Sequence, residues 1–327
     1  MRRYFHATIS LLILVLFLYG CSTKFKYFLT SFGNSVDVSS ININGSQGLK
    51  YYTFSIDGDS HDTFLFFIGG SGCSSFRYYL REYLKGLKGH IKVFALQKRG
   101  FNHFATGLFG CSEKFYKNDY FNRWVSDQEL FINYILKNAK ETPENIVILG
   151  VSEGCSTAAV LATKMESVTH LAMIGCGGMR FIDELRILFK RGQIPFDIDK
   201  EYEKIFSNPD DTSIFLAGHT YKYWSSILDM DPLEYLLSLD IPIIVAMGDK
   251  DKSVPVDSII FLKRQFKKAG KQNLTAIIYH GADHTLRSSE KDFRHDFMKQ
   301  FGEWIYKNEP NKALHLTAIP LALHSGR

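Results

Sequence analysis

The chain has 327 residues, of which 45% are hydrophobic and 22% charged, and its formal net charge is +5. This composition is ordinary for a folded protein, and the basic residues form neither blocks nor alternations with aromatic residues, which excludes a nucleic-acid surface. The chain is long enough for one large domain or two small ones with a sizeable core.

Residues 1–20 have the composition of an export signal. Two arginines precede an apolar run over residues 7–18, and a run of about a dozen residues is shorter than the roughly twenty that span a bilayer. The sequence Leu18-Tyr19-Gly20-Cys21 resembles the lipobox of bacterial lipoproteins, which implies lipidation of Cys21. A plain cleaved signal peptide or an uncleaved anchor are the alternatives. We therefore expect an exported protein that is anchored to a membrane of the cell envelope.

Polar residues rich in Ser, Asn and Gly follow this signal and predict a tether over residues 21–48. Beyond it, short apolar or alternating runs bounded by turn residues predict strands, and the stretches between them predict helices. Because strands and helices alternate, we expect an α/β fold with a mostly parallel, doubly wound sheet over residues 49–307. The expected strands cover residues 49–56, 63–68, 91–96, 145–149, 169–175, 241–247 and 274–279, and the main helices cover 76–87, 126–140, 155–165, 257–269 and 290–307.

The alternation is interrupted at residues 179–240, after the fifth expected strand. Helical pieces separated by turn signals predict a small helical lid inserted over the sheet. Its aromatic residues, among them Tyr223 and Trp224, either line a substrate pocket or fill the interface between lid and core. Pro310 ends the last helix, and we expect residues 308–327 to be an unstructured tail.

The stretch Gly150-Val151-Ser152-Glu153-Gly154 lies between an apolar strand and a helix of small residues. Strand, turn and helix are the parts of a nucleophile elbow, in which a strained turn lifts a serine hydroxyl clear of the sheet. The glycines suit positions where a side chain would collide with the neighbouring helix or strand. We expect Ser152 to be the nucleophile, the alternative being an ordinary turn with a buried serine.

A nucleophilic serine needs a base within hydrogen-bonding reach and a third group that orients the base. Two loops offer them, since residues 248–255 contain two aspartates and residues 280–286 contain two histidines. Each loop directly follows an expected strand. The chain order Ser, Asp, His is that of the α/β-hydrolase class.

With these motifs, the chain resembles the α/β hydrolases over about residues 49–307. Its G-D-K-D-K-S-V-P is similar to the family's G-x-x-D-x-x-V-P, and its H-G-A-D-H-T-L is similar to the family's histidine loop. The resemblance implies that Ser152 is the nucleophile, Asp251 the orienting acid and His284 the general base. Asp249 and His280 are the competing acid and base.

The tetrahedral oxyanion formed by attack of a serine needs preorganised donors. The backbone N–H of Glu153, directly after the nucleophile, is one expected donor. The stretch Gly69-Gly70-Ser71-Gly72 resembles the family's H-G-G-x-G loop, with Ile68 where histidine often stands. This match implies that Gly70 supplies the second donor, with Ser71 next in rank.

Four cysteines remain after Cys21, and they allow three full pairings or four free buried thiols. Export would permit disulfides, and we favour Cys73 with Cys111 because both fall in expected loops on one side of the sheet. The cysteines and histidines lack the spacing of a metal site. We expect neither a metal nor an organic cofactor.

Together the motifs predict a serine hydrolase that cleaves carboxylic esters through an acyl-enzyme. Peptide or amide hydrolysis by the same machinery is the alternative, and its substrate would be a small ester or peptide. A second alternative is a non-catalytic envelope lipoprotein that uses the fold for binding, since fold does not imply function.

Overall fold

The computed structural model describes residues 36–43, 45–101, 103–104 and 110–308. The expected signal sequence, Cys21 and nearly all of the expected tail lie outside these residues. None of the helices in the described part is both long and apolar enough to cross a membrane.

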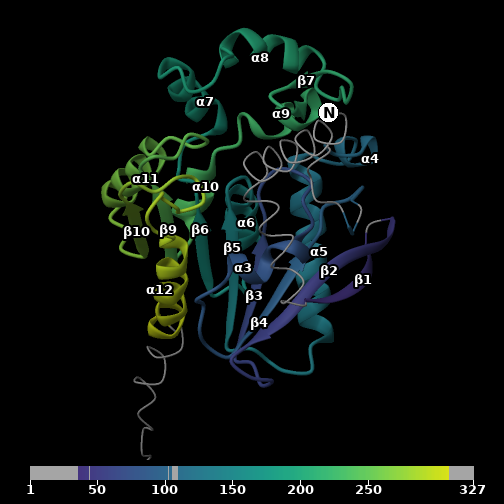
Figure 1. The fold of residues 1–327 in the computed structure, drawn as a ribbon, viewed down its shortest axis with the longest axis vertical. Helices are drawn as coiled ribbons and strands as arrows, with labels where there is room; N and C mark the ends of the chain where they lie inside the picture. Colours follow the sequence, from purple (N-terminus) through teal and green to yellow (C-terminus); the bar gives the residue numbers. More distant parts are fainter. Residues whose placement is uncertain (1–35, 44, 102, 105–109, 309–327) are drawn as a thin grey trace, which may run out of the picture.

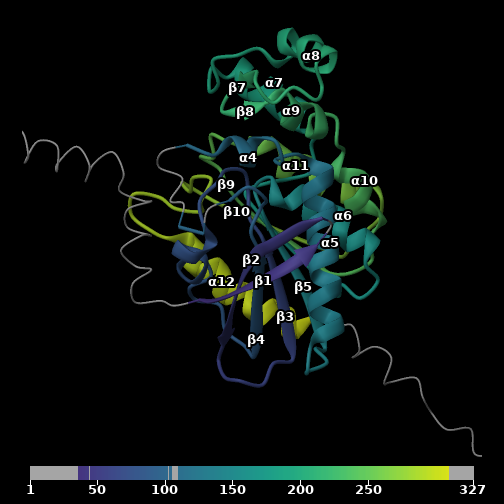
Figure 2. The ribbon, with the colours of Figure 1, turned by 90° about the vertical axis from the view of Figure 1, so that its right-hand side faces the viewer.

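A central sheet of eight strands organises the fold, in the order β1-β2-β4-β3-β5-β6-β9-β10 (Figures 1 and 2). The pairs β1–β2 and β2–β4 are antiparallel, whereas all other neighbours are parallel. The mostly parallel sheet expected from the sequence is therefore confirmed. The strands are β1 (Asp37–Ile43), β2 (Ser46–Ile56), β3 (Thr63–Ile68), β4 (Ile91–Leu96), β5 (Asn145–Val151), β6 (His170–Ile174), β9 (Ile243–Gly248) and β10 (Leu274–Tyr279).

Helices cover both faces of the sheet, which explains why its central strands are buried and mostly apolar. Every residue of β3, β6 and β9 is buried, as expected for strands packed on two sides. One hydrophobic cluster joins the sheet to α5 (Phe121–Asn138), α6 (Gly154–Lys164) and α11 (Asp257–Lys268). The other joins it to α3 (Leu80–Tyr83), which follows the short helix η1 (Phe76–Tyr78), and to α12 (Phe293–Lys307).

The segment between β6 and β9 forms a separate layer above the carboxyl ends of the parallel strands (Figures 1 and 2). Three of its helices lie over this edge together with a two-stranded hairpin and α4 (Glu113–Tyr116). The fourth helix packs beside α6. The inserted elements are α7 (Phe181–Lys190), α8 (Ile198–Ser207), β7 (Phe215–Leu216), β8 (His219–Thr220), α9 (Tyr221–Ile227) and α10 (Pro232–Ser238).

The expected tether is wrong for the residues from Asp37 onward, because they form β1 and the start of β2. Strand β1 pairs antiparallel with β2 and buries Ile41, which is 4% exposed, against the α5 side of the core. Most of its other residues are exposed or half-buried. A strand with so few buried side chains has the composition of a linker, so its sequence alone predicts a tether.

Helix α5 begins at Phe121, five residues before the expected start. Ser126 to Glu129, read as a capping sequence, therefore lie inside the helix. The backbone N–H of Phe121 is instead bonded to Ser226 Oγ at 2.9 Å, and Phe121 and Trp124 are buried in the core. A tertiary contact with α9 thus bonds one backbone N–H of the first turn, and a local sequence pattern does not contain that information.

Candidate active site

Ser152 occupies a sharp turn between β5 and α6. Its φ angle is +56°, which is uncommon for a residue with a side chain and costs free energy that the surrounding structure must compensate. The Ser152 N–H donates to the carbonyl of Ile174 on β6 at 2.8 Å. A Cβ atom at Gly150 would lie 2.6 Å from the carbonyl oxygen of Gly154, and one at Gly154 would collide with the carbonyl oxygen of Ile68. Both glycines are therefore required sterically.

Three side chains from separate loops meet in a chain of hydrogen bonds. Ser152 Oγ lies 3.0 Å from His284 Nε2, and His284 Nδ1 lies 2.6 Å from Asp251 Oδ2. With the Nδ1 proton shared with the carboxylate, Nε2 faces the serine hydroxyl as an acceptor. The fold thus brings together Ser152, Asp251 and His284, the three residues expected from the sequence, in the arrangement that base-assisted nucleophilic attack requires.

Asp251 is held rigidly by its own loop. Its side chain is fully buried, and its Oδ1 accepts the backbone N–H groups of Ser253 at 2.7 Å and Val254 at 3.0 Å. Gly175, with a φ angle of +69°, lies against the histidine, since a Cβ atom there would be 3.0 Å from His284 Cε1. Acid and base therefore have little freedom to turn away from Ser152.

The competing acid and base form a pair of their own at the surface. His280 Nδ1 lies 3.0 Å from Asp249 Oδ2, and the N–H of Gly281 donates to Asp249 Oδ1 at 2.7 Å. The His280 hydrogen bond lowers the pKa of Asp249. His280 and Asp249 are thus bonded to each other and not to the serine, and the His280 side chain is 90% exposed.

The two expected oxyanion donors flank Ser152. Glu153 follows it directly, at the beginning of α6. Gly70 follows β3 and touches the serine, because a Cβ atom at Gly70 would lie 3.0 Å from Ser152 Cβ. Ser71 lies at the same cavity and is exposed. Two neighbouring strand ends thus place backbone groups beside the serine hydroxyl, where an oxyanion would form.

A buried ion cluster that the sequence did not reveal fixes the side chain of Glu153. Lys98 Nζ donates to Asp119 Oδ1 at 2.7 Å and to Glu153 Oε1 at 2.9 Å, and all three side chains are at most 6% exposed. Burial alone would lower the pKa of Lys98, but the two carboxylates raise it well above its usual value. Tyr223 of α9 donates to Glu153 Oε2 at 3.3 Å. Lys98 is the second residue after the end of β4, so its place at the carboxyl edge of the sheet is the one available signal.

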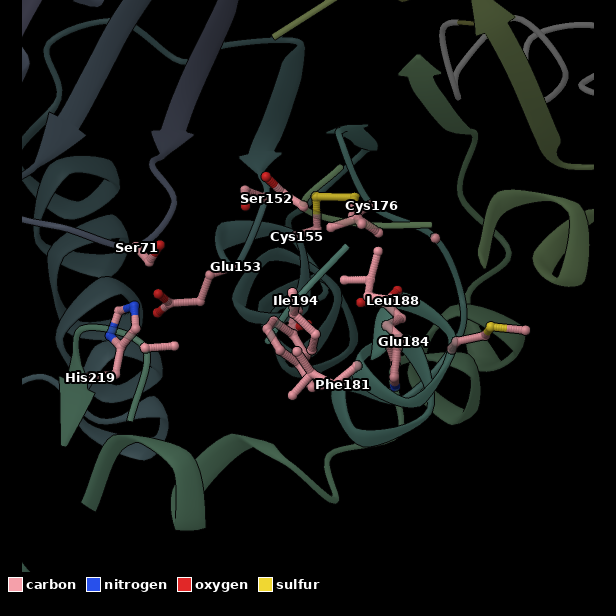
Figure 3. Close-up of a pocket in the computed structure, with 18 of the residues that line it drawn as sticks. Ser71, Ser152, Glu153, Cys155, Cys176, Phe181, Glu184, Leu188, Ile194 and His219 are labelled. Carbon is pink, nitrogen blue, oxygen red and sulfur yellow. A yellow bond between two sulfur atoms is a disulfide. The ribbon is translucent and has the colours of Figure 1, made fainter. Parts of the chain in front are cut away.

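A cavity of about 350 Å³ opens beside Ser152 (Figure 3). In this view Ser71, Glu153 and His219 lie on one side of it, and Leu188 and Glu184 lie on the other. Its apolar lining comes largely from the inserted segment, to which Tyr223 and Trp224 contribute. Sequence reasoning did not single out Glu184 or His219. The apolar lining residues include Met173, Phe181, Leu185, Leu188, Ile194 and Phe196.

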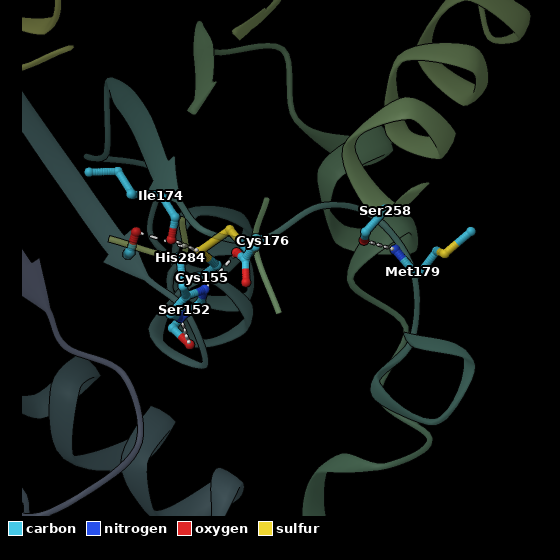
Figure 4. Close-up of a disulfide and its surroundings, with 9 residues drawn as sticks. Ser152, Cys155, Ile174, Cys176, Met179, Ser258 and His284 are labelled. Carbon is cyan, nitrogen blue, oxygen red and sulfur yellow. Dashed lines mark hydrogen bonds and ion pairs between the residues drawn. A yellow bond between two sulfur atoms is a disulfide. The ribbon is translucent and has the colours of Figure 1, made fainter. Parts of the chain in front are cut away.

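Two disulfides are present. The favoured pairing of Cys73 with Cys111 is found, and Cys155 is bonded to Cys176. The second bond lies in the cavity wall and joins the helix that begins behind Ser152 to the loop after β6 (Figure 4). Within the described residues, no group of three or more His, Cys, Asp and Glu side chains is placed to hold a metal ion.

Fold and site together define an α/β-hydrolase-type serine hydrolase. The sequence model of the prolyl oligopeptidase family, the S9 peptidases, matches residues 93–308, which is more than half of the chain. The chain therefore belongs to this family and is a serine hydrolase, either an esterase or a peptidase. No curated protein matches the chain.

Solved structures share the fold at low sequence identity. A Pyrococcus horikoshii acylaminoacyl peptidase is 15% identical with a TM-score of 0.56, over 86% of this chain and 43% of the peptidase chain. A Pyrococcus furiosus esterase is 17% identical with a TM-score of 0.54, over 86% and 95% of the two chains. A thermostable carboxyl esterase from Bacillus coagulans is 18% identical with a TM-score of 0.58, over 84% and 99%. The chain thus spans less than half of the peptidase but nearly the full length of both esterases.

Proposed function

We propose that the protein hydrolyses carboxylic esters with Ser152 as nucleophile, His284 as general base and Asp251 as the acid that orients the histidine. The hydrogen-bonded chain from Ser152 Oγ through His284 to Asp251 Oδ2 is the observation that carries this proposal. The strained φ of Ser152 and the buried anchoring of Asp251 support it, because both hold reacting groups in place before substrate binds.

The reaction proceeds in two halves. Ser152 Oγ attacks the ester carbonyl carbon while its proton passes to His284 Nε2, and the carbonyl oxygen becomes an anion beside the amides of Glu153 and Gly70. Collapse of this intermediate breaks the bond to the alcohol, which leaves with the proton from His284. Water, deprotonated by His284, then attacks the acyl-enzyme and releases the carboxylic acid and free Ser152.

The shape and lining of the cavity favour a small ester over a long peptide. A volume of about 350 Å³ lies at the lower end of the range for small-molecule sites, and the lining suits a short acyl or alkyl chain. Peptide hydrolysis is the second candidate, because the family is named for peptidases. Both candidates use the same three residues.

The nucleophile is tested with a fluorophosphonate probe and short p-nitrophenyl esters, on the wild type, Ser152→Ala and Ser156→Ala. Ser156 is the matched control because it also lies at the cavity, one turn further along α6. We expect labelling and turnover to disappear in Ser152→Ala and to persist in Ser156→Ala. A folded wild type that neither labels nor turns over any ester would instead favour a non-catalytic binding protein.

The substrate class is tested by comparing kcat/KM for p-nitrophenyl esters of two to eight carbons with aminoacyl and dipeptidyl p-nitroanilides. The proposal predicts that an ester is the better substrate. A p-nitroanilide that is turned over with a higher kcat/KM than every ester would make the protein a peptidase.

We also propose that the protein is exported and anchored through a lipid on Cys21. The lipobox-like sequence supports this proposal, and so do two disulfides, because such bonds persist in oxidising compartments. Metabolic labelling with a palmitate analogue in a bacterial host should mark the wild type and not Cys21→Ser. Equal labelling of both, or release of the wild type as a soluble protein, would contradict the anchor.

A further inference from the structure

Glu184 is a carboxyl group in a position where an apolar residue is expected. It lies on the buried face of α7 with Ile182 and Leu188, and it is 7% exposed. Its side chain lines the same cavity as Ser152, and Figure 3 shows it beside Leu188, across the cavity from Glu153. Because Glu is almost never buried without a partner, this residue needs an explanation.

Within the described residues, a single side chain is hydrogen-bonded to the carboxyl group of Glu184. The hydroxyl of Ser258 on α11 donates one hydrogen bond to Glu184, and the same Ser258 Oγ accepts the N–H of Met179 at 3.1 Å (Figure 4). In the part of the chain that the structure describes, no Lys, Arg or His forms an ion pair with Glu184. The neighbouring Asp183 differs, since Arg180 and Arg186 donate to it at 2.9 and 2.8 Å.

The surroundings of Glu184 favour a positive charge. The pKa of Glu184 is raised to about 8, mainly by burial and also by the nearby Asp251 and Asp183, whereas the hydrogen bond from Ser258 acts in the opposite direction. The other charged groups around the cavity are engaged or peripheral. Lys98 is bonded to Asp119 and Glu153, and Asp251 is bonded to His284. His219, which also lines the cavity, lies 3.8 Å from Asp119. Asp257 is paired with Arg191, and Lys252 is exposed at the rim.

We propose that Glu184 selects substrates whose cavity-bound arm ends in a primary ammonium group. The inference rests on the proposed esterase function and names its substrate class. An ammonium group supplies the hydrogen-bond donors and the positive charge that pair with the carboxylate. The apolar walls contact the methylene chain that carries the ammonium group. A neutral arm of the same length would leave Ser258 as the one partner, among the described residues, of the buried carboxyl group, which disfavours that substrate.

Binding is tested without catalysis, by the rise of Tm with concentration of n-hexylammonium or its neutral isostere n-hexanol. In the wild type at pH 8.5, we expect the ammonium to bind about 10- to 100-fold more tightly, as a charge-assisted hydrogen bond allows. Glu184→Gln should lose this preference. The matched control Asp183→Asn should keep it, because Asp183 pairs outside the cavity. An equal preference in the wild type and Glu184→Gln, or none in the wild type, would overturn the proposal.

The pH dependence of binding gives a readout that a merely structural role would not produce. Below pH 8 Glu184 holds a proton, so an ammonium ligand must displace it, whereas above pH 8 the carboxylate is already charged. n-Hexylammonium stays charged because alkylamines have a pKa near 10. The preference for ammonium over alcohol should therefore rise about tenfold or more between pH 6 and pH 9 in the wild type. It should stay flat in Glu184→Gln, and a flat wild type would contradict the proposal.

Specificity is tested with p-nitrophenyl 6-aminohexanoate and p-nitrophenyl heptanoate, which have the same length and differ by one charged end. We expect kcat/KM to favour the amino ester in the wild type and in Asp183→Asn, and to lose that preference in Glu184→Gln. Hydrolysis of the neutral ester by the wild type separates the two levels of failure. Its absence would count against the esterase, whereas its presence without an amine preference would count against the role of Glu184 alone.

Discussion

Two aspartate–histidine pairs stand at the carboxyl ends of β9 and β10, and only one of them reaches the serine. Asp251 and His284 are 0% and 25% exposed in their side chains, whereas Asp249 and His280 are 25% and 90% exposed. The first pair is enclosed by the loop amides and by Gly175, and the second lies open to solvent. The same two residue types therefore form a hydrogen-bonded chain to Ser152 in one place and a surface ion pair in the other.

Burial and a third partner decide what an aspartate–histidine pair of this kind does. A solvent-exposed ion pair contributes little, because water screens it and each side chain loses freedom. A buried pair that also bonds a serine hydroxyl fixes the tautomer and the orientation of the histidine. The predictions below test this contrast, beginning with the largest expected effect.

Removing the charge of each aspartate compares the pairs directly. Asp251→Asn should lower kcat about 10⁴-fold, because an amide cannot hold His284 with Nε2 free to accept the serine proton. Asp249→Asn should change kcat by less than about twofold. Steady-state kinetics on one ester measure both. Similar losses in both variants, or a greater loss in Asp249→Asn, would show that Asp251 is not the acid that orients the histidine.

The buried ion cluster extends the contrast from activity to stability. Lys98→Met leaves two carboxylates buried without their cation, so we expect the free energy of unfolding to fall by about 3–5 kcal/mol. Lys164→Met removes the half-exposed partner of Glu129, which also joins α6 to α5, and should cost less than about 1 kcal/mol. Denaturant unfolding of both variants measures the difference. Equal costs would show that Lys98 is not required to neutralise Glu153 and Asp119.

The strands and the residues Ser152, Asp251 and His284 were predictable because their sequence signals are local. Continuous apolar runs such as β3 and β9 identify buried strands by themselves. A serine between two glycines requires the turn that the structure has, and the aspartate and histidine loops each follow a strand whose carboxyl end lies on the same edge. The choice of Asp251 over Asp249 came from the resemblance to the family, not from composition or spacing.

The remaining parts were not predictable because they depend on contacts between distant segments. Lys98 and Glu153 are 55 positions apart in sequence, and no pattern along the chain indicates that they meet. Glu184 follows another acidic residue in an amphipathic helix, and only packing decides that Asp183 faces the arginines while Glu184 faces the cavity. Strand β1 was missed because Ile41 is its one fully buried residue among exposed neighbours.

The central claim is that His284, and not His280, activates Ser152. The direct test is the rate of fluorophosphonate labelling of His284→Ala and His280→Ala, with mass spectrometry to locate the modified residue. We expect a label on Ser152 in the wild type, a rate reduced at least about 10⁴-fold in His284→Ala, and a wild-type rate in His280→Ala. A label on another serine, or a loss of labelling in His280→Ala while His284→Ala reacts normally, would contradict it.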